Sequence, residues 1–521
     1  MEKKRVGNLE FHIQDGVLYS VSGEEKNIIL PEGITEIRSK VFYEHKTLEM
    51  IELPKGLKKI GNKAFMYCVH LKKVILPDSA TQIGEYAFAH CYDLTDIHLS
   101  DSVRTIRKGT FLYCQQMKEF DFPKNLSRIG EEAFYRCHSL EKVILNDKVK
   151  YIDESAFKHC ENIRHLKLSD NLEQIKEAAF SHCHALTSVI FPDKITSLQR
   201  KVFSECGIEE IALPRDLHTI EYAAFSKCPS LKKVEFPKQL LKIHSQAFFD
   251  SGLEEIIFHT EDLIDQHLIL YKEAFNHCQH LEKIIFKGDH FEFSYDAFLK
   301  TPWLENQGDF VCQQDKLLAY QGNQHNIKIP EGIQSIGSYA FYQNEDLVSI
   351  ELPTTLKEID RGAFSHCHHL SSIQFNDGLK SIGERAFANC SKLKNIVFSD
   401  SITKIGEKAF EECPSLESIE LPPYVTYLPN GLFYRCQHLR HVTLPKYLEE
   451  TYSVSLYSDR LDGGIALSGR GAFEDCSSLE NIIIPSLVKK VGFRTFEGCN
   501  QLKIIYEKGF QGVIETQGEI V

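Results

Sequence analysis

Apolar residues return along this chain at a fixed interval, and one phenylalanine marks each return. Residues 74–91, V-I-L-P-D-S-A-T-Q-I-G-E-Y-A-F-A-H-C, represent the unit that nearly the whole sequence repeats. Of the 18 intervals between 19 anchor phenylalanines, 14 are 23 residues long. Such a period predicts a stacked solenoid, in which each coil buries its apolar face only against its neighbours. The anchors are Phe42, Phe65, Phe88, Phe111, Phe134, Phe157, Phe180, Phe203, Phe225, Phe248, Phe275, Phe298, Phe341, Phe364, Phe387, Phe410, Phe433, Phe473 and Phe496.

Each repeat predicts one strand and one short helical turn. The segment L-x-x-I-x-L, as at residues 71–76, alternates with the period of a strand, and a proline often ends it. The segment I-G-x-x-A-F-x-x-C follows, and it spaces Ile83, Ala87 and Cys91 by four, as on one face of a helix. Gly84 occupies a slot that we interpret as the helix N-cap. Because other coils have Arg107 or Lys176 there, we expect no forced positive φ at this slot.

Cysteine follows the same period. Fifteen of the 16 cysteines stand three residues after an anchor phenylalanine, and only Cys312 does not. A column of small, soft side chains predicts buried, reduced thiols that fill a tight corner. Stacked coils bring such cysteines to about 5 Å, so disulfide pairing stays open as an alternative.

The motif L-x-x-I-x-L-P-x-x-I-x-x-I-G-x-x-A-F-x-x-C resembles the BspA-type leucine-rich repeat family over almost the entire chain. The predicted fold is an α/β repeat solenoid. It is a hairpin-capped leucine-rich-repeat horseshoe, with a parallel sheet on the concave face and short helical turns on the convex face. A parallel β-helix shares the period but needs three strands in each coil, whereas we expect one. The family resemblance implies a cell-surface or secreted protein linked to adhesion.

Breaks in the period divide the chain. We expect an N-terminal hairpin cap at 1–34, a first lobe at 35–300 and a boundary with a second cap-like hairpin at 301–333. A second lobe follows at 334–505, with an insertion at 446–470, and a C-terminal cap or tail at 506–521. The second cap is predicted because residues 310–333 match residues 11–34 at a constant offset of 299. A hairpin bulging from one uninterrupted horseshoe is the alternative.

Composition and charge limit the partners and the cellular location that we expect for the protein. The net charge of −13 is spread along the chain, which argues against a nucleic-acid partner. No apolar run approaches the roughly 18 residues that a membrane span requires, and the first residues show no secretory signal. The sequence as written therefore predicts a cytoplasmic protein, with the cell surface or secretion as the alternative. We expect a monomer.

No catalytic constellation or cofactor motif is evident, and we expect no enzyme activity, no cofactor and no metal site. Histidines gather beside the cysteines, as in S-H-C-H-A-L at 181–186. Since the residues on both sides of a buried cysteine point outward, we expect these imidazoles to diverge, although stacked columns of them can hold adventitious Zn²⁺ or Ni²⁺.

The predicted function is a non-enzymatic protein-binding scaffold, with adhesion as the role implied by the resemblance. A carbohydrate-binding or carbohydrate-processing solenoid and a structural spacer stay open. The candidate surface is the outward position just before the last apolar residue of each strand, together with the tyrosines of the insertion. Mixed charge with exposed aliphatic residues suits a protein partner. The candidate residues are Glu52, Ile75, His98, Asp121, Ile144, Lys167, Ile190, Tyr447, Tyr452 and Tyr457.

Overall fold

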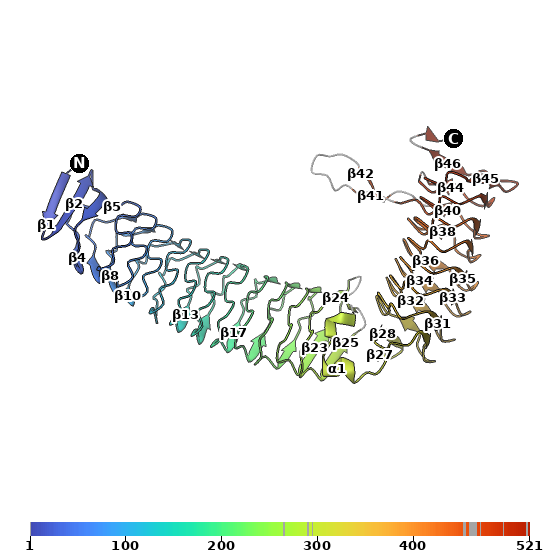
Figure 1. Cartoon of the computed structure of the whole chain (residues 1–521), viewed down its shortest axis with the longest axis horizontal. Coiled ribbons are helices and arrows are strands. Elements are labelled where there is room, and N and C mark those ends of the chain that lie inside the picture. The colour runs from blue at the N-terminus through green and yellow to red at the C-terminus, as the bar shows by residue number, and fades with distance from the viewer. Residues whose placement is uncertain are drawn as a thin grey trace. The chain divides into compact units, whose positions relative to one another are not determined.

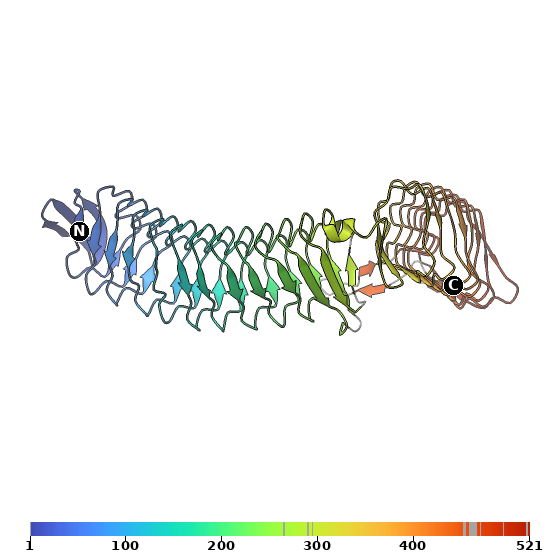
Figure 2. The same ribbon diagram turned by 90° about the horizontal axis from the view of Figure 1, so that it is seen from below.

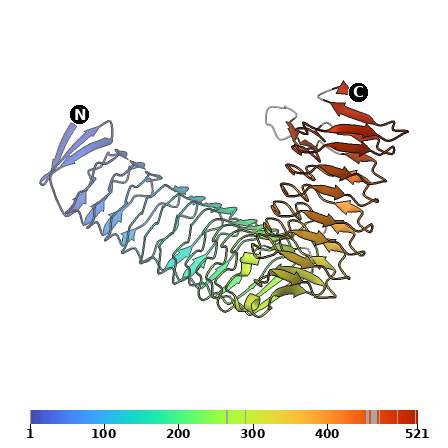
Figure 3. The ribbon, with the colours of Figure 1, turned by 45° about the vertical axis from the view of Figure 1, so that its right-hand side comes forward.

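The computed structural model describes residues 2–263, 266–288, 291–293, 295–451, 455–457, 466–468, 470–492, 494–516 and 519–520. The chain divides into two compact units. Unit 1 comprises Met1–Phe291 with Asp296–Glu305, and unit 2 comprises Glu292–Tyr295 with Asn306–Val521. Each unit is a stack of coils, which Figure 1 shows for unit 1 from its N-terminal cap onward and Figure 3 shows for the successive coils of unit 2.

Antiparallel strands cap the first coil of each unit. In unit 1, β1 (Glu2–Val6), β2 (Leu9–Gln14) and β3 (Val17–Ser22) form the cap, and β3 pairs in parallel with the first coil. In unit 2 the hairpin of β27 (Phe310–Gln313) and β28 (Lys316–Tyr320) does the same. Both hairpins carry a register shift at the equivalent place, which is His12/Ile13 in one and Val311/Cys312 in the other. Strand β1 was not predicted. These hairpins occupy sheet edges that would otherwise be unpaired.

Most coils of unit 1 contribute two short strands, and the strands that pair between successive coils do so in parallel and in register. The first strand of a coil lies on the L-x-x-I-x-L segment, and these strands form a row in Figure 2. The first strands are β4 (Asn27–Ile29), β6 (Met50–Glu52), β8 (Lys73–Ile75), β10 (Asp96–Ile97), β13 (Lys142–Ile144), β15 (His165–Lys167), β17 (Ser188–Ile190), β19 (Glu210–Ala212), β21 (Lys233–Glu235), β23 (Glu255–His259) and β25 (Lys283–Lys287). The second strands are β5 (Glu36–Ile37), β7 (Lys59–Ile60), β9 (Gln82–Ile83), β11 (Thr105–Ile106), β12 (Arg128–Ile129), β14 (Tyr151–Ile152), β16 (Gln174–Ile175), β18 (Ser197–Leu198), β20 (Thr219–Ile220), β22 (Lys242–Ile243), β24 (Leu268–Leu270) and β26 (Phe291–Phe293).

Unit 2 repeats this arrangement. Its first strands are β29 (Asn326–Lys328), β31 (Ser349–Glu351), β33 (Ser372–Gln374), β35 (Asn395–Val397), β37 (Ser418–Glu420), β39 (His441–Thr443), β43 (Asn481–Ile484) and β45 (Lys503–Tyr506). Its second strands are β30 (Ser335–Ile336), β32 (Glu358–Ile359), β34 (Ser381–Ile382), β36 (Lys404–Ile405), β38 (Tyr427–Leu428), β40 (Glu450–Thr451), β44 (Lys490–Val491) and β46 (Val513–Thr516), and β46 also pairs with β47 (Glu519–Ile520). The prediction of a single strand in each coil was therefore wrong.

The segment after the second strand is an arc of turns, so the predicted helical turns were also wrong. In the coil of Phe88, Tyr86 and His90 have φ values of 56° and 60°. The N–H groups of Tyr86, Phe88 and His90 donate to carbonyl oxygens of the next coil at 2.7–2.9 Å, and the intervening N–H groups close turns within the coil. In a helix, by contrast, every N–H group after the first turn donates to the carbonyl oxygen four residues earlier in the same segment. In the described residues the helical segments are η1 (Tyr295–Phe298) and α1 (Pro302–Glu305).

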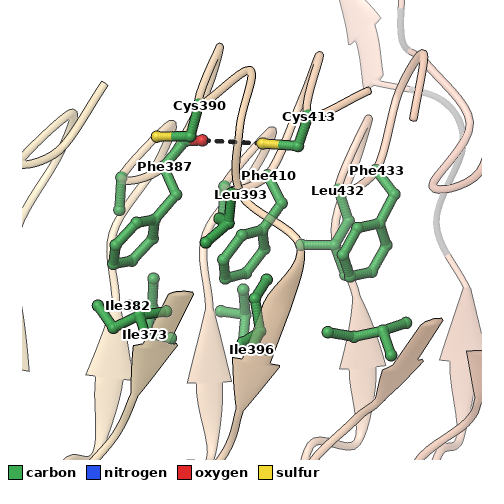
Figure 4. Close-up of a cluster of buried hydrophobic side chains, with 14 of the residues drawn as sticks. Ile373, Ile382, Phe387, Cys390, Leu393, Ile396, Phe410, Cys413, Leu432 and Phe433 are labelled. Atoms are coloured by element: carbon green, nitrogen blue, oxygen red, sulfur yellow. Dashed lines mark hydrogen bonds between the residues drawn. The ribbon is translucent and has the colours of Figure 1, made fainter. Parts of the chain in front are cut away.

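The anchor phenylalanines form a continuous internal stack in each unit, as predicted. Neighbouring rings are nearly parallel, with centroids between 4.8 Å for Phe341 and Phe364 and 5.8 Å for Phe88 and Phe111. Figure 4 shows Phe387, Phe410 and Phe433 in this stack. Offset stacking at such distances adds to the gain from burying the rings. The core is thus one apolar column that grows with each coil.

The cysteines form a second internal column. All 16 are described, and each is a free thiol. The 15 column cysteines each donate the S–H to the carbonyl oxygen of the anchor phenylalanine one coil earlier, as Cys413 does to Phe387 at 3.2 Å (Figure 4). Burial raises the pKa of Cys137 to about 12. The prediction of buried, free thiols is confirmed for 14 of the 15 column cysteines, whereas Cys499 is only partly buried. The hydrogen bond was not predicted.

The large insertion leaves the stack of coils intact. Strand β39 pairs with β43 and β40 with β44, and the rings of Phe433 and Phe473 stack at 5.5 Å. The extra residues enter after β40 and include the antiparallel pair β41 (Ser455–Tyr457) and β42 (Ala466–Ser468). Residues 446–451 therefore belong to a regular coil.

Candidate binding surface

The outward side chains of the first strands form one face of unit 1, which we call the strand face. In β8, β13, β17 and β21 the central residue is buried and its two neighbours are exposed. This follows from the alternation of side chains along a strand. Because the strands pair in register, each outward position becomes a column that runs along the stack.

The first outward column consists mostly of charged residues that pair between coils. Lys73 Nζ lies 2.6 Å from the Asp96 carboxylate, and Lys142 Nζ lies 2.9 Å from that of Glu119. The hydrogen bond from Lys142 lowers the pKa of Glu119. This column was not predicted, although the alternation along each strand places it two residues before the predicted column.

The second outward column contains seven of the ten candidate residues, and all seven are exposed. Direct cross-strand partners in it include Glu52 with Ile75 and Ile144 with Lys167. Its aliphatic members reach far into solvent, since Ile144 is 56% exposed and Ile190 is 80% exposed. The seven are Glu52, Ile75, His98, Asp121, Ile144, Lys167 and Ile190.

A hollow interrupts the strand face where residues 119–122 form no strand, between β10 and β13. Its volume is about 630 Å³. Three candidate residues, His98, Asp121 and Ile144, line it, and His98 Nδ1 lies 3.2 Å from the Asp121 carboxylate. Lys124 donates to Asp101 at 2.7 Å across the same hollow and lowers the pKa of Asp101.

Of the three candidate tyrosines, only Tyr447 has a side chain that the structure describes. Tyr447 is exposed and stacks on Tyr424 with ring centroids 5.3 Å apart, in a regular coil of unit 2. Tyr452 lies outside the described residues. Tyr457 ends β41, and its side chain is outside the description. A tyrosine cluster on the insertion therefore stays a prediction.

Histidines and tyrosines beside the buried cysteines stack along the outer edge of the turn arcs. The ring of His90 lies between those of Tyr67 and Tyr113, with centroids 4.4 and 4.7 Å away. Burial lowers the pKa of His90. His159 and His182 stack in the same way at 4.1 Å. Burial and the neighbouring His182 lower the pKa of His159 to about 4.

The expectation that imidazoles beside one cysteine diverge was wrong for Cys183. Ligand atoms of His182, His184 and Glu205 all lie within 4.8 Å of one another. The arc explains this difference, because side chains on its left-handed residues do not alternate in the way that side chains on a strand do.

Among the described residues, no helix has the length and apolar content that crossing a bilayer requires.

The sequence matches the family model described as the BspA type leucine-rich repeat region, a model of six copies. The matched residues are 12–141, 81–209, 151–268, 199–307, 314–440, 357–463 and 466–513. They cover nearly the whole chain. Among curated proteins, none matches the sequence.

Several solved structures resemble this one. A leucine-rich repeat protein from Bacteroides ovatus has 25% sequence identity, with 81% of this chain and 95% of that chain covered and a TM-score of 0.42. A leucine-rich cell surface protein from Faecalibacterium prausnitzii has 20% identity, with 97% and 95% covered and a TM-score of 0.23. The pneumococcal vaccine antigen PcpA has 16% identity, with 97% and 99% covered and a TM-score of 0.25.

Proposed function

We propose that this chain, which belongs to the BspA-type leucine-rich repeat family, is a non-enzymatic scaffold that binds a protein through the strand face of unit 1. The exposed aliphatic residues of the second outward column carry this proposal. Ile144 and Ile190 are 56% and 80% exposed on strands that the neighbouring coils hold in register. Apolar anchors on a rigid surface, surrounded by polar residues, are what a protein partner buries at the centre of an interface.

The charges around these anchors favour recognition over catalysis. A general acid works best when its pKa lies near the working pH. In the hollow, Lys142 lowers the pKa of Glu119 and Lys124 lowers that of Asp101. Both carboxylates are therefore ionised at neutral pH. Fixed ion pairs of this kind select a partner by complementary charge and set its orientation.

A setting at the cell surface and a role in adhesion extend the proposal, because both are usual in the family that the motif indicates. The cytoplasm is the alternative that the sequence as written predicts. Fractionation of cells that produce the native protein, followed by protease treatment of intact cells, separates the two. Protection of the protein from the protease contradicts the surface setting.

We also propose that the protein is a monomer, and light scattering on the purified chain tests this.

A capture experiment tests the strand face. The full chain is immobilised, and proteins retained from extracts are identified by mass spectrometry. The test variant combines Ile144→Lys with Ile190→Lys, which places two charges where apolar anchors are expected. The control is Leu487→Lys, because Leu487 is 52% exposed but belongs to the turn after β43 in unit 2 and is not part of the strand face.

We expect a specific partner to bind the wild type and the control, and to be lost with the double variant. A partner that the double variant retains at full strength contradicts the proposed surface. Deletion of residues 452–468 in the same assay tests the insertion as a second contact. A glycan array probed with the same variants distinguishes a carbohydrate ligand, and binding there that depends on Ile144 and Ile190 would overturn the protein-binding proposal.

A further inference from the structure

Two histidines and a glutamate converge on the outer edge of the turn arcs in unit 1. His182 and His184 flank Cys183, which is fully buried. Glu205 holds the position equivalent to His182 one coil later, and His182 Nδ1 lies 3.1 Å from its carboxylate. One ligand atom from each of the three residues lies within 4.8 Å of the others.

The backbone holds these side chains in place. The N–H of His182 donates to Ser204 at 2.8 Å, and that of Glu205 donates to Ser226 at 2.9 Å, so both residues are fixed to the following coil. Each also has a left-handed φ, 62° for His182 and 60° for Glu205. On the side of the preceding coil, the ring of His159 stacks on that of His182 at 4.1 Å.

The other side of the cluster is open. In the next coil the position of His184 is taken by Gly207, and a Cβ there would lie 2.1 Å from the carbonyl oxygen of His184. No side chain can occupy this place without a shift of the backbone. His184 is correspondingly exposed. An ion therefore has access to the cluster from solvent.

We propose that His182, His184 and Glu205 form a zinc-binding site. Imidazole nitrogens and a carboxylate oxygen are usual Zn²⁺ ligands, with bonds of about 2.0–2.2 Å. A tetrahedral ion with such bonds needs ligand atoms about 3.3 Å apart, which small side-chain rotations reach from the observed separation. Three protein ligands leave a fourth position for water or for a group from a partner. Cu²⁺ and Ni²⁺ also bind such ligands, but the tetrahedral arrangement of three protein ligands and one open position is the one that Zn²⁺ adopts.

Unit 2 contains a matched control. His366 and His368 flank Cys367, with ring centroids 5.7 Å apart and planes at 84°, close to the 6.0 Å and 86° of His182 and His184. The third position, however, is Asn389, whose neutral amide replaces the carboxylate of Glu205. Two further differences accompany this one: Ser391 stands where unit 1 has Gly207, and His368 Nδ1 lies 3.0 Å from the carbonyl oxygen of Asn389.

Titration of the full-length chain with Co²⁺ and Zn²⁺ tests the site. Tetrahedral Co²⁺ gives intense visible absorption, and Zn²⁺ displaces it. We expect this band in the wild type and in His366→Ala. We expect affinity to fall more than about tenfold in His184→Ala, and also in Glu205→Asn, which copies the third position of unit 2. Asn389→Glu should add a second cobalt site.

Absence of the band from the wild type overturns the proposal. Equal affinity in the wild type, His184→Ala and Glu205→Asn also overturns it, because adventitious binding to other histidines would then account for the signal. Circular dichroism of each variant confirms that the coils remain folded. Since His184 is exposed, its replacement is not expected to disturb them.

Discussion

Replacing Cys413 distinguishes two reasons for the cysteine column. The side chain is fully buried, and its S–H donates to the Phe387 carbonyl oxygen at 3.2 Å. Cys413→Ala removes this hydrogen bond, worth about 1 kcal/mol. It also removes a buried atom of about the size of a methyl group, at about 0.5–1.5 kcal/mol. We therefore expect the alanine variant to lose about 1.5–2.5 kcal/mol of local stability.

Cys413→Ser decides between the two reasons. A hydroxyl keeps a donor for the Phe387 carbonyl, so we expect it to cost about 0.5–1.5 kcal/mol, less than alanine. If the column served packing alone, the buried hydroxyl would lack a partner and cost about 1–3 kcal/mol. Serine would then be the more damaging change. A serine variant that is less stable than the alanine variant refutes the reasoning.

The assay must report on one coil, because stacked repeats open locally as well as globally. Hydrogen exchange with mass spectrometry on peptides spanning residues 387–416 gives the local opening free energy of each variant. Cys312→Ala is the matched control, since Cys312 lies outside the column and is only partly buried. We expect its effect on those peptides to be negligible.

Three further predictions concern the thiols, the stacked histidines and the insertion. Iodoacetamide should modify Cys312 and Cys499 in the native protein before the 14 buried cysteines, and peptide mapping checks the order; early labelling of a buried cysteine would contradict the burial. Burial lowers the pKa of His90, so below its ordinary value of about 6.5 the unfolded chain binds a proton that the folded chain does not. The free energy of unfolding should therefore decrease as the pH is lowered from about 7.5 to about 5.5. The decrease should be smaller in His90→Tyr, which extends the tyrosine stack, and equal decreases in the wild type and this variant, measured by urea titration, would contradict the prediction. Deleting residues 452–468 joins Thr451 to Gly469 and restores the I-G-x-x-A-F spacing. The melting temperature should therefore stay within about 2 °C of that of the wild type. A large decrease would show that the insertion supports the coils.

Much of the architecture could be predicted from the sequence because one residue type marks each coil. Phe88 and Cys91 are buried, and their columns follow directly from the 23-residue period. The turn arc could not be predicted in the same way. Spacings of three and four suit a helix, but the sequence does not show that alternate N–H groups bond to the next coil. Tyr86 and His90 adopt left-handed φ values because this hydrogen bonding requires them, although neither residue type signals it.

The candidate surface was predictable to a similar degree. Alternation along the strand placed Ile144 and Ile190 outward, and both are exposed. The hollow beside His98 was not predicted, because it depends on residues 119–122 failing to form a strand. Convergence of His182 and His184 was missed for a related reason. It depends on the path of the arc, and the sequence alone suggested a different path.

The hydrogen bonds between coils run along the stacking axis of each unit, since strands lie across it. A force along that axis therefore breaks the hydrogen bonds of one coil after another. It does not load the hydrogen bonds of many coils at the same time. Each coil of the usual 23 residues that detaches frees about 80 Å of extended chain. Each unit should therefore lengthen under tension in even steps, and this property would let a tethered molecule yield gradually while distant coils keep their shape.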